Sequence, residues 1–176
     1  MFYQYLKKHV EALLFAAGNP VSVQKLAEIL TVDTENILRL LEDLKNDMKD
    51  ENRGLTIAEV AGGYQLCTKP ELATTIEKLG LVRETRLSVA ALETLAIVAF
   101  KQPVTRQEIE KIRGVNVDRV MNTLLERGLI KEVGRKEVVG RPILYGTTDE
   151  FLVHFGLNSL EDLQKIGDLL PPAEQL

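Results

Sequence analysis

The chain has 176 residues, of which 45% are hydrophobic and 27% charged, and a formal net charge of −4. This length allows one large domain or two small ones, and the composition is that of an ordinary globular protein. The longest apolar run, residues 92–100, is far shorter than the ~20 residues of a membrane-spanning helix, and the acidic balance argues against a generic nucleic-acid coat.

The first 54 residues carry the hydrophobic spacing of helices. Apolar residues recur at helical intervals and define the faces that should point inward. These positions are Val10, Leu13, Leu14, Ala17, Leu26, Ile29, Leu30, Ile37, Leu40, Leu41, Leu44 and Met48. The helix ends are marked by residues that favour caps or stop a helix. In chain order these are Gly18, Ser22, Asp33 or Thr34, and Gly54.

A β-hairpin and a last helix should follow. Residues 55–60 and 64–68 are short runs typical of strands, and Gly62-Gly63 between them tolerates the positive φ of a tight turn. Pro70 should then begin a helix that runs to about Leu79, because proline is favoured in the first helical turn.

The second half repeats this order of elements. Ser88 is the expected cap of its first helix, and Thr105-x-x-Glu108 is a capping box, in which each side chain satisfies a free backbone N–H of the other residue. The inward-facing helical positions are Leu92, Leu95, Ala96, Ala99, Ile109, Ile112, Val117, Val120, Met121, Leu124 and Leu125. The remaining helix ends and strands are marked by Gly114, Gly128, residues 130–134 and residues 143–145.

A short motif strengthens the repeat, because Pro-Val-Ser-Val-Gln at 20–24 returns as Pro-Val-Thr-Arg-Gln at 103–107. Internal similarity with one order of elements indicates two copies of one structural unit. Helices with a helix–turn–helix corner and a trailing hairpin make a winged helix. The predicted fold is therefore mainly α with small β-hairpins, in two tandem winged-helix domains. We place these at residues 1–80 and 88–176, joined by a linker at 81–87.

No pattern for catalysis or metal binding is present in the sequence. His9 and His154 lie in opposite terminal regions, and the motifs of zinc proteases, α/β-hydrolases and P-loop proteins are missing. Cys67 is the single cysteine, so an internal disulfide is impossible and we expect a small, half-buried strand residue. We therefore expect a cytoplasmic protein without enzymatic activity, cofactor or metal.

The charges of the two candidate recognition helices do not favour DNA reading. The helix at 33–50 has six acidic and three basic residues, and that at 116–127 has two of each. The more basic feature is the second wing, with Lys131, Arg135, Lys136 and Arg141 against Glu132 and Glu137. Three roles are open for this wing. It is a solvated hairpin whose ion pairs are internal, or it contacts the DNA backbone, or it contacts a protein partner. The rival function is accordingly a winged-helix DNA-binding regulator.

Several stretches match one known family in sequence and order. The longest is Leu-Ser-Val-Ala-Ala-Leu-Glu-Thr-Leu-Ala-Ile-Val-Ala-Phe-Lys-Gln-Pro-Val-Thr-Arg-Gln-Glu-Ile-Glu-Lys-Ile-Arg-Gly-Val at 87–115. The others are 124–130, Gly134-Arg135, 140–148, 151–157 and 159–163, with 11–18 in the first half. On these residues the chain resembles the segregation and condensation protein B family. One departure is Phe100, where the family has tyrosine.

The resemblance implies an interaction protein. Members of this family form homodimers, chiefly through the N-terminal unit, and the dimer binds the kleisin, segregation and condensation protein A (ScpA). The kleisin bridges the ATPase heads of SMC, so the contact with SMC is indirect, and the assembled complex acts on DNA. For this chain the resemblance implies a kleisin-binding homodimer in chromosome condensation and segregation.

Two groups of residues are candidates for these contacts. The dimer candidates are Phe2, Tyr3, Tyr5 and Leu6. The kleisin candidates are Arg135, Arg141, Tyr145, Phe151 and Phe155. Packing over their own domain is the alternative for every aromatic residue, because aromatic side chains favour both cores and interfaces.

Overall fold

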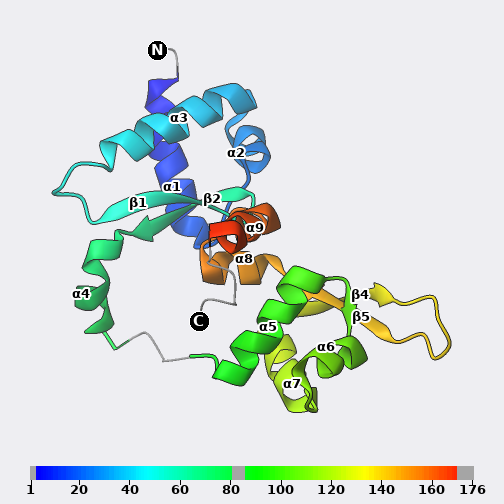
Figure 1. Ribbon diagram of the computed structural model, residues 1–176. Coiled ribbons are helices and arrows are strands. Elements are labelled where there is room, and N and C mark those ends of the chain that lie inside the picture. Colours follow the sequence, from blue (N-terminus) through cyan, green and yellow to red (C-terminus); the bar gives the residue numbers. More distant parts are fainter. Residues whose placement is uncertain (1–2, 81–85, 170–176) are drawn as a thin grey trace. The chain divides into compact units, whose positions relative to one another are not determined.

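The computed structural model describes residues 3–80 and 86–169. The chain divides into two compact units, Met1–Glu84 (unit 1) and Thr85–Leu176 (unit 2), each with helices and a small antiparallel sheet (Figure 1). The mainly helical fold class is confirmed. The predicted linker, residues 81–87, falls mostly outside the described residues, so the domain boundaries stay a prediction.

Unit 1 begins with helices and ends with a wing and a short helical tail. Its elements are η1 (Gln4–Leu6), α1 (Lys7–Ala17), α2 (Val23–Leu30), α3 (Thr34–Asp47), β1 (Leu55–Val60), β2 (Gly63–Thr68), η2 (Pro70–Leu72) and α4 (Ala73–Glu77). Two predicted caps between α1 and α2 are confirmed. Gly18 ends α1 with a left-handed φ of +65°, and the Ser22 hydroxyl accepts a hydrogen bond from the Lys25 N–H at 3.2 Å.

The wing of unit 1 is the predicted hairpin with a turn one residue earlier. β2 begins at Gly63, so the turn residues are Ala61 and Gly62, with φ of +50° and +70°. We expected Gly63 to be a turn residue, but the structure requires a glycine there because another part of the backbone lies very close. A Cβ there would lie 2.9 Å from the Val21 carbonyl oxygen, where Val21 and Tyr64 exchange two backbone hydrogen bonds.

The core of unit 1 lies between α1, α2, α3 and β1. Its buried side chains are Leu6, Val10, Leu14, Leu26, Ile37, Leu40, Leu41, Leu44, Met48 and Ile57. The inward positions predicted for Ala17 and Ile29 are wrong, because both side chains are exposed. α2 packs on the core along the line of Leu26 and Leu30, and Ile29 lies about 60° round the helix from Leu26.

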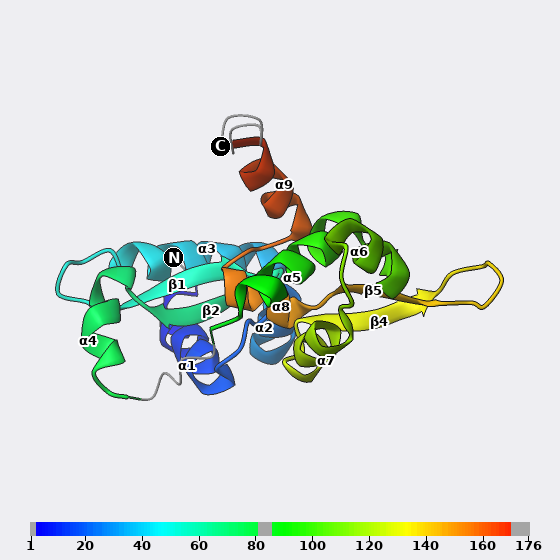
Figure 2. The same cartoon turned by 60° about the horizontal axis from the view of Figure 1, so that its bottom comes forward.

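Unit 2 repeats the helical corner and wing and adds two C-terminal helices. Its elements are α5 (Val89–Lys101), β3 (Val104–Thr105), α6 (Arg106–Arg113), α7 (Asp118–Glu126), β4 (Ile130–Arg135), β5 (Ile143–Thr147), α8 (Asp149–Phe155) and α9 (Leu160–Leu169). The long loop between β4 and β5 projects from the sheet (Figure 2). Both predicted caps are confirmed: the Ser88 hydroxyl accepts from the Ala91 N–H, and Thr105 and Glu108 form the capping box.

The repeated Pro-Val motif has one structural role in both units. Val104 of β3 pairs antiparallel with Tyr145 of β5, and Val21 pairs with Tyr64 in the same way. The sheet of unit 2 consequently has the order β3-β5-β4. β3 was not predicted, because a strand of two residues has no measurable periodicity.

The core of unit 2 lies beneath α5, α6 and α7. Its buried side chains include Ala91, Leu95, Val98, Val104, Ile109, Val117, Met121, Leu124, Ile130, Tyr145 and Phe151. The inward positions predicted for Leu92, Ala96 and Ile112 are wrong, because all three are exposed. α5 is apolar on almost every side, so its periodicity fits two faces, and the face through Leu95 and Val98 is the one that is buried.

Candidate functional site

The second wing is an exposed hairpin whose arginines bond within the hairpin. Arg135 Nη1 donates to the Arg141 carbonyl oxygen at 3.2 Å, and Arg141 Nη2 lies 3.2 Å from Glu137 Oε1. Arg141 has a positive φ of +39° and follows Gly140 at +86°. The turn geometry therefore directs Arg141 back along the hairpin toward Glu137.

An ion pair connects this wing, one residue past the end of β4, to α6. Lys136 Nζ lies 2.6 Å from Glu108 Oε1, while Glu108 Oε2 accepts hydrogen bonds from the N–H and the hydroxyl of Thr105, both at 2.8 Å. These contacts, that of Lys136 first, lower the pKa of Glu108 from 4.5 to about 2. The capping carboxylate of α6 thus also sets the direction of the wing.

The same wing exposes aliphatic side chains beside its charges. Val133 and Val138 are each about half exposed, and Val139 is fully exposed. Lys131 is exposed as well, and its side chain forms no hydrogen bond or ion pair within residues 3–80 and 86–169. This combination of cations and valines is suited to an acidic surface that also offers apolar contacts.

Tyr145 belongs to the core rather than to the surface. Its side chain is 3% exposed and sits beside Arg106, which forms an ion pair with Asp118. Because it lies in β5 between β3 and β4, it joins the wing to the start of α6. Because it is buried, this side chain is not part of the surface that a partner could contact.

The two phenylalanines of α8 divide between core and surface. Phe151 is buried, whereas Phe155 is 43% exposed and its ring centroid lies 4.9 Å from that of Phe151. His154 packs edge-on against Phe155 at 5.1 Å. The spacing of four thus places both rings side by side, and it leaves Phe155 as the exposed member.

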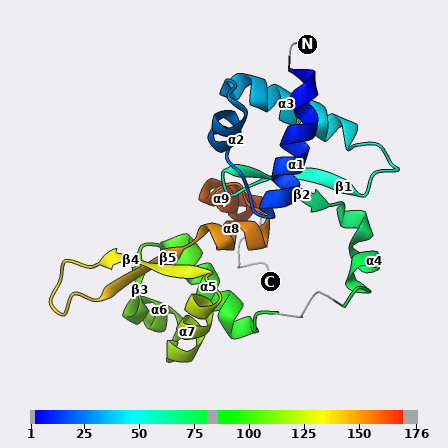
Figure 3. The ribbon, with the colours of Figure 1, turned by 180° about the vertical axis from the view of Figure 1, so that it is seen from behind.

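The kleisin candidates therefore do not form one surface. Arg135 ends β4 and Arg141 lies in the loop that follows, whereas Phe155 ends α8. This loop points away from α8 (Figures 1 and 3). Sequence reasoning also missed an exposed apolar stripe along α5. Its members are Val89, Leu92, Ala96 and Phe100. The i, i+3, i+7, i+11 spacing was visible, but the apolar composition of α5 left its outer face undetermined.

The dimer candidates divide in the same way. Tyr3 is half-buried against the core of unit 1, and Leu6 is buried in it. Tyr5 is 63% exposed. Phe2 lies outside the described residues. Of the residues chosen from the sequence, Tyr5 is thus the one that the described surface leaves free for a second molecule.

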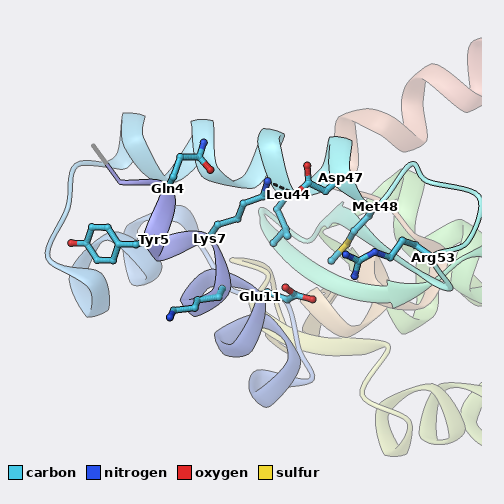
Figure 4. A pocket seen from close by; sticks show the side chains of 9 residues that line it. Gln4, Tyr5, Lys7, Glu11, Leu44, Asp47, Met48 and Arg53 are labelled. Carbon is cyan, nitrogen blue, oxygen red and sulfur yellow. Dashed lines mark ion pairs between the residues drawn. The ribbon is translucent and has the colours of Figure 1, made fainter. Parts of the chain in front are cut away.

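A pocket of about 320 Å³ lies between η1, α1 and the C-terminal half of α3 (Figure 4). Leu44 and Met48 supply apolar side chains, and Lys7 forms an ion pair with Asp47 across the gap from α1 to α3. The remaining lining residues are Gln4, Tyr5, Lys8, Glu11 and Arg53. The pocket is therefore lined by both apolar and charged groups.

The described residues contain no group of three or more His, Cys, Asp or Glu side chains arranged to hold a metal ion. None of their helices is long and apolar enough to cross a membrane. Cys67 is half-buried in β2, and this burial raises the pKa of its thiol. A raised pKa lowers the thiolate fraction, so the side chain behaves as the strand residue that we expected.

Residues 8–166 match the family model described as segregation and condensation complex subunit ScpB. The chain belongs to this family. A segregation and condensation protein B from Moorella thermoacetica is 53% identical over 98% of this chain and 89% of its own length. The one from Desulforamulus reducens is 49% identical over 100% of this chain and 97% of its own. The ScpB match therefore spans both units.

Among solved structures, ScpB from Mycobacterium tuberculosis is 39% identical, with a TM-score of 0.41 over 86% of this chain and 95% of that one. A dimer of the ScpB N-terminal domain complexed with ScpA peptide is 36% identical, with a TM-score of 0.43 over 45% of this chain and 99% of that one. The assignment to the ScpB family rests on the sequence matches.

Proposed function

We propose that this chain is a non-catalytic subunit of a condensin-like SMC–kleisin complex and acts as a homodimer that binds the kleisin ScpA. The observation that carries the proposal is the match to a complex subunit over residues 8–166, through both units. A subunit of a complex acts through surfaces that fit other chains. Exposed apolar side chains on ordered helices are the physical property that such surfaces need.

Unit 2 offers the kleisin two separate exposed regions. The wing carries Arg135 and Arg141 with the valines around them, and the end of α8 carries Phe155. We propose that one of these regions contacts ScpA. Tyr145 and Phe151 support them from the core, because both are buried and neither reaches the surface.

Co-elution of the full chain with a ScpA fragment tests the proposal. We expect a stable complex on size-exclusion chromatography, and no complex would contradict the function. Arg135→Glu with Arg141→Glu reverses the charge of the wing, and Phe155→Glu places a charge on α8. The variant that weakens binding at least about tenfold, more than 1.4 kcal/mol, identifies the contact.

A DNA-binding regulator is less well supported. Two of the four cations of the second wing already pair with carboxylates, Lys136 with Glu108 and Arg141 with Glu137. The two functions differ in a simple measurement. A regulator binds duplex DNA with an affinity that falls steeply as salt rises, whereas a kleisin-binding subunit retains its protein partner and binds free DNA weakly.

A further inference from the structure

The outward face of α1 has an unusual composition for a solvated helix. Its exposed members are Lys8, His9, Ala12, Phe15 and Ala16, and Tyr5 of the preceding η1 extends the same face. Phe15 is 74% exposed and Tyr5 is 63% exposed, while Val10 and Leu14 on the opposite side are buried. A surface helix normally presents mostly charged and polar side chains to water. Here two aromatic and two alanine side chains occupy that face. The helix itself lies in front of α3 and the hairpin in Figure 3.

The pocket of about 320 Å³ adjoins the N-terminal half of this face (Figure 4). Tyr5 and Lys8 belong to both the face and the pocket, and Leu44 and Met48 give the pocket apolar side chains. An exposed aromatic ring and the apolar part of this pocket complement each other, because a ring that covers Leu44 and Met48 leaves water.

We propose that α1 of a second copy lies antiparallel on this face and places its Phe15 at the mouth of the pocket, beside Tyr5 and Lys8. This arrangement rests on the homodimer proposed above and specifies its surface. In an antiparallel pair centred on position 10, position 5 faces position 15 and position 8 faces position 12. A two-fold axis perpendicular to the helices keeps Phe15 of each copy on the side where the other copy has its pocket.

The charges of the face complement themselves in the same arrangement. The side chains of Lys8 and Glu11 form no hydrogen bond or ion pair within the described parts of the chain. The antiparallel pairing brings Lys8 of one copy near Glu11 of the other, and the symmetry repeats this contact. Ala12 and Ala16 allow the two helices to approach closely, since contact distance between helices depends on side-chain size.

Sedimentation equilibrium of the full chain measures the dimer dissociation constant. We expect Phe15→Glu to raise it at least about tenfold, because the ring would leave an apolar contact. Lys8→Glu and Glu11→Lys should each raise it severalfold, and the double variant should return it to within about twofold of the original value. Phe100→Glu, on an equally exposed phenylalanine of α5, is the matched control and should leave dimerisation unchanged.

The outcomes separate this surface from the proposed function. An unchanged dissociation constant for Phe15→Glu overturns the surface alone. A monomeric original chain overturns both the surface and the homodimer of the proposed function, and co-elution with the ScpA fragment then decides independently whether the kleisin assignment stands. Variants that stay dimeric but lose the ScpA fragment assign the face to the kleisin and also overturn the proposal. Circular dichroism confirms that each variant is folded. Restoration by the charge exchange is an effect that damage to the fold does not produce.

Discussion

Some single residues have two structural roles, because they lie where two elements of the fold contact each other. Glu108 caps α6 and pairs with Lys136 of the second wing. Gly63 combines a position in β2 with a close approach to the backbone of Val21. At such positions a small chemical change acts on two elements at once, so these residues give the sharpest tests.

Glu108→Gln should remove part of the pH dependence of unfolding. The folded-state pKa of about 2 lies below the ordinary 4.5, so the stabilisation is fully present above the ordinary value and is lost as pH falls through the folded value. Because the side chain is 42% exposed, screening by solvent reduces the effect to about 1 kcal/mol. Urea unfolding between about pH 5 and 2 measures it, and Glu126→Gln, an exposed glutamate of α7, is the control. The assignment would be contradicted if the free energy of unfolding of both variants changed with pH at the same slope.

Gly63→Ala should lower the free energy of unfolding of unit 1 by about 2 kcal/mol, because the new Cβ meets backbone atoms that cannot rotate away. Gly54→Ala is the matched control. There the nearest atom is Leu72 Cδ1 at 3.3 Å, the end of a flexible side chain, so the change should stay within about 0.5 kcal/mol. Thermal melts of both variants decide, and equal melting temperatures would refute the close contact at Val21.

At the scale of elements, one arginine determines how α6 lies on α5. Arg113 Nη1 donates to the Ala90 carbonyl oxygen at 2.7 Å and to the Thr94 hydroxyl at 2.6 Å, and Nη2 lies 2.8 Å from Glu93. The side chain is largely buried, while the neighbouring Ile112 is 56% exposed. The Arg113 guanidinium, which makes several hydrogen bonds, thus occupies the contact with α5 that hydrophobic spacing alone assigns to Ile112.

Arg113→Ala should therefore destabilise unit 2 by about 2–3 kcal/mol, since it removes several hydrogen bonds and the packing of the side-chain stem. Ile112→Ala should change stability by less than about 0.5 kcal/mol. Chemical denaturation of the two variants gives a direct comparison at adjacent positions. A larger loss for Ile112→Ala would mean that α6 presents its other side to α5.

At the scale of the whole molecule, the two units have separate hydrophobic cores. Leu41 is buried in the core of unit 1 and Met121 in that of unit 2. Small domains of this kind gain from association, because a chain of such length buries a smaller fraction of its surface than a large domain does. A role in an assembly of several chains is consistent with that property.

Met121→Ala should lower the stability of unit 2 by about 3 kcal/mol and increase amide exchange there about 100-fold, with little change in unit 1. Leu41→Ala should produce the reverse pattern. Hydrogen exchange followed by mass spectrometry resolves the two units in one experiment. If either variant accelerated exchange equally throughout the chain, the units would unfold as one and the predicted division into domains would be wrong.

Local structure and family membership could be predicted from the residue types and their order along the chain. Caps such as Ser22 and the pair Thr105 and Glu108 act within one turn of backbone, so their residue types are sufficient to place helix ends. The repeated Pro-Val motif is also a local pattern, and its second occurrence indicated two similar units. The long match at residues 87–115 indicated the ScpB family.

Which apolar side chains remain exposed could not be predicted, because it depends on how the elements pack against one another. α5 has apolar residues on nearly all sides, so spacing could not choose between the face of Leu95 and that of Leu92. Tyr145 and Phe155 have the residue types of an interface, yet one is buried and the other exposed, because burial depends on elements distant in the sequence. The surface consists of the side chains that packing leaves exposed. Packing depends on contacts between elements, and the periodicity along one helix does not reveal those contacts.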